Sequence, residues 1–367
     1  MSRENTNQFK AVAIILMFFH HFFGFPGYMT LPENEWRGIF LDYNTIVTIG
    51  RASKICVPLF MFCSGYGLYK TYISKRELPR HGNLIRTVTF LTGYWAVLFL
   101  VAIPYQLIMG TLKTEYFIFN PLALINNDSY LYVSFSWYVK FYFFLLLLLP
   151  LIRWAFLFFG RYRWTDNPVF EILVWIALPV LVSWLLRDYY REYSYEGIPV
   201  MLYSSALMIL SYLPMFIIGA LFCKYSVCEG LKSLIPDNVP GRCAAAVLGL
   251  SLFTLVIVLR CILDISDGRV TDPVYSPIIA SGLILFFGAL PSPRRSILQW
   301  IGKYSFQYWL LSGMFFLNTP EFQWIVYLPK YTAAILIWMF AVLALPAFIM
   351  KKAGALLALP VTRLSDR

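Results

Sequence analysis

A series of ten apolar stretches constrains the fold of this 367-residue chain more than any other feature. Each stretch is close to the roughly 20 residues that a helix needs to cross the hydrocarbon core of a bilayer. Charged residues make up only 13% of the chain and its mean hydropathy is +0.66, whereas about 25% of the residues of a typical soluble domain are charged. The stretches span residues 9–29, 55–72, 86–108, 136–152, 169–186, 199–222, 244–263, 273–290, 297–317 and 331–350. The sequence therefore predicts an all-α membrane protein, a bundle of about ten transmembrane helices.

The segments between these stretches are too short for a separate soluble domain. The longest, residues 109–135, has neither the length nor the regular pattern to fold alone. The first apolar stretch is followed by Gly24-Phe25-Pro26-Gly27 and not by the small residues of a signal-peptide cleavage site. We therefore expect the first stretch to be retained, and the chain to form one domain.

The net charge of +11 is distributed unevenly between the two sides of the predicted bundle. If the N-terminus is cytoplasmic, the inner side holds 20 of the 30 Lys and Arg residues but only 7 of the 19 acidic residues. Membrane proteins keep Lys and Arg in their cytoplasmic loops, so this orientation is favoured, with both termini in the cytoplasm. The charge needs no nucleic-acid partner, and membrane lipids are the expected surroundings.

The first stretch contains a lysine and two histidines, in the segment KAVAIILMFFHH. Eleven helical residues turn about 1100°, so Lys10 and His21 lie on nearly the same face, about 16 Å apart along the axis, and His20 points about 100° away. Ionisable groups inside a membrane face protein or water and are functional candidates, and a neutral imidazole suits a general base. Two alternatives stay open. Each histidine can be a core residue bonded to a carbonyl of a neighbouring helix, and Lys10 can be an interfacial cation instead of a phosphate ligand.

The second to fourth stretches supply further polar candidates. Ser64 precedes a glycine in the second stretch, Arg86 begins the third, and Trp137 and Tyr142 lie early in the fourth. Small residues also serve close helix packing, and aromatic residues also serve as interfacial anchors, so these structural roles remain alternatives. The six cysteines show no spacing typical of a metal site or a disulfide framework. Known motifs such as the P-loop, the dinucleotide-binding glycines and His-Glu-x-x-His do not occur in the sequence.

In combination, these segments resemble the membrane-bound acyltransferase-3 family. The spacing of Lys10 and His21 is similar to the family's Arg or Lys, ten residues, then His. VPLFMFCSGYGL, with Ser64, resembles a second family segment, and SWYVKFYFFLLLLLP resembles its Trp-rich fourth region. IGKYSFQYWLLS resembles a late motif, although Ser312 stands where the family often has histidine. Because the resemblance covers most of the chain, residues 1–367 are expected to form one integral-membrane acyltransferase-like domain.

The resemblance implies transfer of an acyl group from acyl-CoA to a hydroxyl group. The expected acyl group is acetyl, and the expected acceptor is a carbohydrate or another hydroxyl-bearing molecule of the cell envelope, as in polysaccharide O-acetylation. The expected location is a bacterial cytoplasmic (inner) membrane. Acyl-CoA is a donor substrate here, so no tightly bound cofactor and no metal are expected.

The resemblance also implies roles for individual residues. His21 is the expected general base, and polar groups near it steady the oxyanion of the thioester carbonyl. The candidate residues are, for catalysis, His21, Ser64 and Tyr142; for the donor phosphates, Lys10, Arg86 and Arg76; and for the acceptor, His20 and Trp137.

A function of another class also fits ten membrane spans. A transporter or flippase for a glycan or a small solute would use His20 and His21 as a proton relay. Transporters with inverted repeats carry paired Gly- or Pro-interrupted spans in their two halves, and the histidine pattern of the first stretch has no second copy. The acyltransferase interpretation is therefore preferred.

Overall fold

The computed structural model describes residues 1–28, 36–38, 40–78, 81–124, 131–162, 164–192, 198–263, 271–290, 296–314 and 319–363. These residues form helices and connecting turns, and the β-structure among them is one isolated bridge between Arg37 and Tyr331. Five of the cations that the charge distribution assigns to the inner side lie outside the described residues: Arg80, Arg163, Arg294, Arg295 and Arg367. The predicted all-α fold is confirmed for the described part of the chain.

Eight helical segments of the described residues are long and apolar enough to cross a membrane. Three of them combine two helices separated by a short 3₁₀ or π turn, a fourth combines α15 and α16, and the other four lie within single helices. They are Tyr43–Ile73 (α2, Tyr43–Ala52, and α3, Cys56–Leu68), Gly82–Ile108 (α4, Gly82–Val97, and α5, Ile103–Ile108), Trp137–Phe159 (α6), Pro168–Leu186 (α7, Pro168–Ile172, and most of α8, Leu178–Glu192), Tyr203–Lys224 (within α9, Ile198–Lys224), Val239–Ile262 (α11), Asp272–Ala289 (α12) and Thr332–Thr362 (α15, Thr332–Val342, and α16, Ala344–Thr362).

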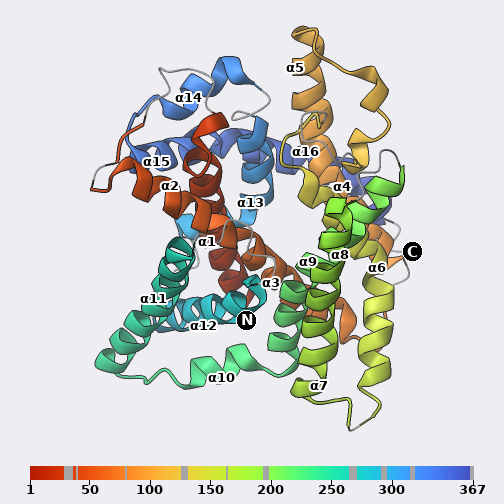
Figure 1. Cartoon of the computed structure of the whole chain (residues 1–367), viewed down its shortest axis with the longest axis vertical. Helices are drawn as coiled ribbons and strands as arrows, with labels where there is room; N and C mark the ends of the chain where they lie inside the picture. The colour runs from red at the N-terminus through yellow and green to blue at the C-terminus, as the bar shows by residue number, and fades with distance from the viewer. Residues whose placement is uncertain are drawn as a thin grey trace.

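The remaining two predicted spans correspond to α1 (Arg3–Phe23) and α13 (Ile297–Gly313). Both are helical, but they are not among the eight apolar segments, because α1 carries several polar residues and α13 has only 17 residues. Other helices surround this pair, as Figure 1 shows for α1, so its polar side chains face protein instead of lipid. Two short helices, α10 (Val227–Ser233) and α14 (Gln323–Tyr327), connect the longer ones.

The ends of α1 differ from those of the first apolar stretch. The side chain of Ser2 accepts a hydrogen bond from the backbone N–H of Asn5, which caps the helix well before residue 9. The helix ends at Phe23, where Gly24 and then Pro26 follow. The predicted end at residue 29 is therefore wrong, because hydropathy marks the apolar segment and not the capping residues that stop a helix.

Glycines let the central helices approach closely. A Cβ atom on Gly302 of α13 would lie 1.8 Å from the backbone oxygen of Asn7 in α1, and one on Gly65 of α3 would lie 1.7 Å from the backbone oxygen of Phe216 in α9. Small residues at such crossings are the usual device for helix packing in membranes. Gly65 therefore has the packing role that the sequence left open for this segment.

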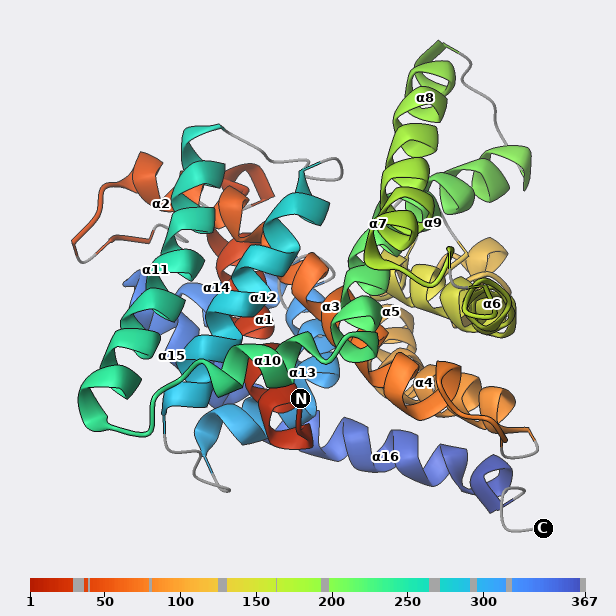
Figure 2. The same cartoon turned by 90° about the horizontal axis from the view of Figure 1, so that it is seen from below.

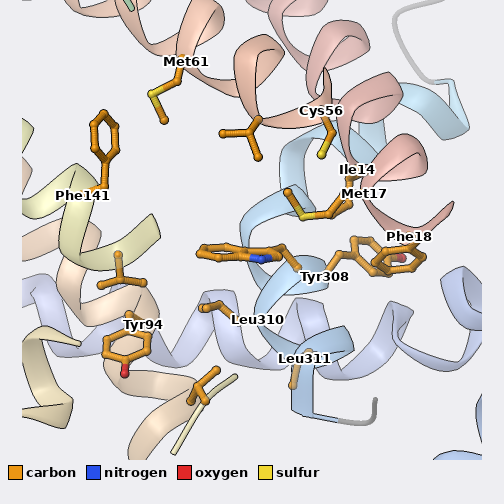
Figure 3. Packing of buried hydrophobic residues seen from close by; sticks show 14 of the residues in the cluster. Ile14, Met17, Phe18, Cys56, Met61, Tyr94, Phe141, Tyr308, Leu310 and Leu311 are labelled. Carbon is orange, nitrogen blue, oxygen red and sulfur yellow. The ribbon is translucent and has the colours of Figure 1, made fainter. Parts of the chain in front are cut away.

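The helices form two sides around α1 and α3. Figures 1 and 2 show α11 and α12 on one side and α6, α8 and α9 on the other. Buried apolar side chains join the central helices, and Figure 3 shows Phe18 of α1 beside Tyr308 of α13, with ring centroids 6.2 Å apart. This core fixes how α1 is rotated toward α3, α6 and α13, and so which neighbours its polar residues meet.

Candidate active site

His21 lies near the outer end of α1 and is almost fully enclosed. Its residual exposure is 8%, and its ring stacks on that of Phe135, with centroids 4.0 Å apart and planes 13° apart. The Nδ1 atom of His21 is buried and has no hydrogen-bond partner among the described residues. Buried polar atoms are almost always paired, and an orphan calls for an explanation such as a catalytic role.

Phe135 has an unusual backbone conformation at this position. Its φ of 62° lies in the left-handed region, which costs a residue with a side chain about 1–3 kcal/mol. The ring is held between His21 and α13, since a Cβ atom on Gly313 would lie 3.3 Å from Cδ2 of Phe135. The start of α6 and the outer end of α13 thereby position the imidazole of His21.

His20 differs from its neighbour. Its Nδ1 lies 2.8 Å from the backbone oxygen of Gly50 in α2, and its ring makes an edge contact with Phe25. In this arrangement Nδ1–H donates to the carbonyl, which is the core-histidine alternative that the sequence left open. The assignment of His20 to the acceptor stays a prediction.

A buried ion pair braces the same outer region. Arg260 of α11 pairs with Asp272 of α12, and its Nε donates to the backbone oxygen of Ala52, at 2.9 Å. Ala52 lies in α2 two residues after Gly50, the partner of His20. The pair therefore ties α11 and α12 to the helix that orients His20.

Cations of the N-terminal half of α1, of α13 and of the middle of α16 gather on the predicted inner side, where α13 packs against both α1 and α16. The charges of Lys303, Lys10 and Arg3 act on Lys351, whose Nζ lies 4.9 Å from the ring centroid of Tyr304. The Nζ of Lys303 lies 5.4 Å from the same centroid. We call Arg3, Lys10, Lys303 and Lys351 the inner cation group. Among the described residues, none of its members forms a salt bridge with a carboxylate.

A second polar cluster joins α3, α4 and α6. The hydroxyl of Ser64 lies near those of Tyr138 and Tyr142, and the charge of Arg86 acts on Tyr142. The guanidinium of Arg86 lies 5.1 Å from the ring centroid of Tyr72, and its Nη1 is buried without a hydrogen-bond partner in the described part of the chain. Three residues that the sequence named separately, Ser64, Arg86 and Tyr142, are thus brought together.

Lys10 and Ser64 lie at similar levels along α1 and α3. The charge of Lys10 acts on Cys63, which directly precedes Ser64. Phe9, the residue before Lys10, stacks on Phe62 of α3, with centroids 6.0 Å apart. Ser64 is therefore at the level of Lys10, more than two helical turns inward of His21.

Aromatic residues of α4, α6 and α13 surround the hydroxyl cluster. The ring centroid of Phe90 lies 4.6 Å from that of Tyr142 and 5.2 Å from that of Phe306. Tyr138 makes an edge contact with Trp309, at 5.4 Å. Rings can contact the apolar parts of a ligand that lies between the cations and His21.

Three other residues singled out in the sequence have partners of their own. Arg76 is exposed, its backbone oxygen accepts from Nη2 of Arg153 at 3.2 Å, and no hydrogen bond, ion pair or ring contact among the described residues joins its side chain with Arg86 or the inner cation group. Trp137 stacks on Tyr212, at 5.4 Å. The hydroxyl of Ser312 donates to the backbone oxygen of Trp309, at 2.8 Å, and is engaged within its own helix.

Sequence reasoning missed Lys303 and Lys351 as partners of Lys10. Lys303 lies within the quoted segment IGKYSFQYWLLS, so the segment itself was a signal, whereas the sequence around Lys351 contains none. Within the described residues, no group of three or more His, Cys, Asp or Glu residues is arranged to hold a metal ion.

A family model described as an acyltransferase domain matches residues 4–351. The chain belongs to the acyltransferase-3 family. The match begins in the first turn of α1 and ends at Lys351 in α16, so it includes His21 of this acyltransferase, the hydroxyl cluster and the inner cation group except Arg3. Neither the curated proteins nor the solved structures contain a match to the chain.

Proposed function

We propose that this acyltransferase takes its acyl group, acetyl in the simplest case, from acyl-CoA and transfers it to a hydroxyl of a carbohydrate or another cell-envelope acceptor. The observation that carries this proposal is the buried, unpartnered Nδ1 of His21, on the same helix as Lys10. Since α1 is continuous between them, the two residues are separated by about 16 Å along the axis. That length suits a pantetheine arm whose phosphates are held at the inner end.

In the proposed reaction His21 acts as a general base. Its unprotonated ring nitrogen takes the proton of the acceptor hydroxyl while the hydroxyl oxygen attacks the thioester carbonyl carbon. The new C–O bond forms, the C–S bond breaks, and the thiolate of CoA leaves with the proton that His21 received. Stacking on Phe135 supports this role because it orients the imidazole before the acceptor binds.

The level of the hydroxyl cluster favours a role in donor binding. The charge of Arg86 acts on Tyr142 and that of Lys10 acts on Cys63, the neighbour of Ser64, whereas His21 lies three helical turns from Lys10 along α1. We therefore propose that Arg86 and Lys10 bind the diphosphate of the donor, and that the two hydroxyl groups hydrogen-bond to the same part of the ligand. The oxyanion would then be stabilised by other groups, nearer to His21.

The orientation of the chain supports a cytoplasmic donor. The inner cations lie on the side that holds 20 of the 30 Lys and Arg residues, and this excess marks the cytoplasmic face. The proposal places the enzyme in a bacterial cytoplasmic membrane, with the acyl group carried along α1 from the inner side toward His21.

The test uses the purified full chain in lipid nanodiscs with radiolabelled acetyl-CoA and a panel of glycans. The wild type should release free CoA and label one of the acceptors. The variant His21→Ala should lose roughly 10²- to 10⁴-fold in rate, the usual contribution of a general base, and should still bind CoA. The variant His20→Ala should lose less, because its Nδ1 is held by the Gly50 carbonyl. Equal transfer rates for the wild type and His21→Ala would refute the assignment of the base.

A further inference from the structure

The inner cation group places positive charges together, and among the described residues none of them has an acidic partner. The ammonium of Lys351 donates to the backbone oxygen of Lys303, and both side chains flank the ring of Tyr304. Glu4 is next to Arg3 in the sequence, but it forms no salt bridge with the group in the described part of the chain. Like charges near a low-dielectric region repel one another unless an anion is bound between them.

The exposure of the four side chains suggests how such an anion enters. Lys10 and Lys351 are half-buried, whereas Arg3 and Lys303 are exposed at the inner surface. An anion bound by Lys351 and Lys303 would thus keep contact with the cytoplasm, while the charge of Lys10 also acts on Cys63 of α3.

We infer that Lys351 and Lys303 bind the 3′-phosphate of the coenzyme A portion of the donor, an inference that rests on the proposed function. Coenzyme A carries two separate anionic groups, a diphosphate and a 3′-phosphomonoester at its adenosine end. Arg86 acts on Tyr142 of the hydroxyl cluster and Lys10 on the nearby Cys63, so these two cations suit the diphosphate, which leads to the pantetheine arm. The more exposed pair, Lys303 and Lys351, suits the adenosine end, and two ammonium groups match a phosphomonoester dianion.

The phosphate of an anionic lipid headgroup shares this chemistry. The nucleotide is favoured because the charge of Lys10 acts both on Lys351 and on Cys63, the neighbour of Ser64 within the helix bundle. A lipid headgroup in the inner leaflet would need to contact only the exposed residues of the inner cation group, Arg3 and Lys303.

The test compares the binding of CoA and of 3′-dephospho-CoA to the full chain in nanodiscs. The wild type should bind CoA about 10- to 100-fold more tightly, the difference expected for charged hydrogen bonds to one phosphate. The variant Lys351→Ala should lose most of that preference and keep its affinity for 3′-dephospho-CoA, while Lys351→Arg should retain the preference. The matched control is Lys352→Ala. The Nζ of Lys352 lies over Phe348 of the same helix, 5.8 Å from the ring centroid, so both affinities should stay unchanged.

A second variant guards against misfolding. Lys303 is exposed, so Lys303→Ala should fold as the wild type does and should reduce the preference for CoA in the same direction. The inference is overturned if Lys351→Ala weakens both ligands equally, or if neither variant changes the ratio of their affinities.

Nanodiscs with and without phosphatidylglycerol distinguish the lipid from the nucleotide. If the site belonged to a headgroup, phosphatidylglycerol would bind to the wild type but not to Lys351→Ala. The preference for CoA over 3′-dephospho-CoA would then be the same in both proteins, and this result would overturn the inference. If the wild type binds neither CoA nor 3′-dephospho-CoA, the proposed function itself fails. If the wild type binds CoA but neither lysine variant changes the preference for CoA over 3′-dephospho-CoA, the 3′-phosphate site is refuted and the proposed function stands.

Discussion

The closest crossing of α1 and α13, at Gly302, leads to a prediction whose magnitude can be worked out from the structure. In the variant Gly302→Ala the distance from the new Cβ to the Asn7 oxygen would have to open from 1.8 Å to at least 3.0 Å, the lower limit that real Cβ atoms respect. The obstacle is backbone, so the two helices themselves must separate. Overpacking of this kind costs about 1–3 kcal/mol, and alanine recovers about 0.5–1 kcal/mol of helix propensity relative to glycine. We expect a net loss of stability of about 1–2 kcal/mol.

The matched control is Gly67→Ala in α3. A Cβ atom on Gly67 meets nothing within 4 Å, so only the gain in helix propensity remains and the variant should be at least as stable as the wild type. Both variants are measured by denaturant unfolding in the same detergent micelle, together with CoA affinity. Because Gly302 precedes Lys303, separation of the helices should also weaken CoA binding. If Gly302→Ala is as stable as Gly67→Ala and binds CoA equally well, the close α1–α13 crossing does not organise the donor site.

Three further predictions concern charge. Lys10→Arg should keep CoA affinity, whereas Lys10→Ala should weaken it about 10- to 100-fold, as isothermal titration would measure; an unchanged affinity in Lys10→Ala would make this lysine an interfacial anchor. Arg260→Ala should cost about 3–5 kcal/mol in denaturant unfolding because it removes the ion-pair partner of the buried Asp272. The control Arg242→Ala breaks an exposed pair with Asp237, in which the charges are 3.6 Å apart, and should cost about 0–1 kcal/mol. Similar losses of stability in the two variants would contradict the buried ion pair. A reporter enzyme fused to the C-terminus should be active on the cytoplasmic side, and activity only outside the cell would refute the ten-span orientation.

The late turns of α1 show the limit of sequence reasoning most directly. Helical periodicity places Lys10 and His21 on one face, and the continuous helix bears this out. Periodicity cannot tell which of the two adjacent histidines forms a hydrogen bond with a neighbouring helix. That depends on Gly50 of α2, which takes the Nδ1 of His20, and on Phe135, which stacks on His21 without bonding it.

The proposed donor site shows the same limit over a longer range. The sequence named Ser64, Arg86 and Tyr142 one by one, but their proximity depends on the packing of α3, α4 and α6. It gave no weight to Lys351, because nothing near that residue in the chain resembles a motif, and its partner Lys10 is at the other end of the sequence.

The sequence by itself determined the all-α membrane fold, the approximate positions of the spans and the expected orientation. These properties are local, since each span must satisfy its own backbone hydrogen bonds in lipid and each loop carries its own charges. Only the tertiary structure decided which cations share a site and which histidine keeps a free nitrogen. Those outcomes depend on how each helix is rotated against its neighbours. Close crossings at glycines, such as Gly65 against Phe216 and Gly302 against Asn7, set that rotation, and each of them joins distant parts of the chain.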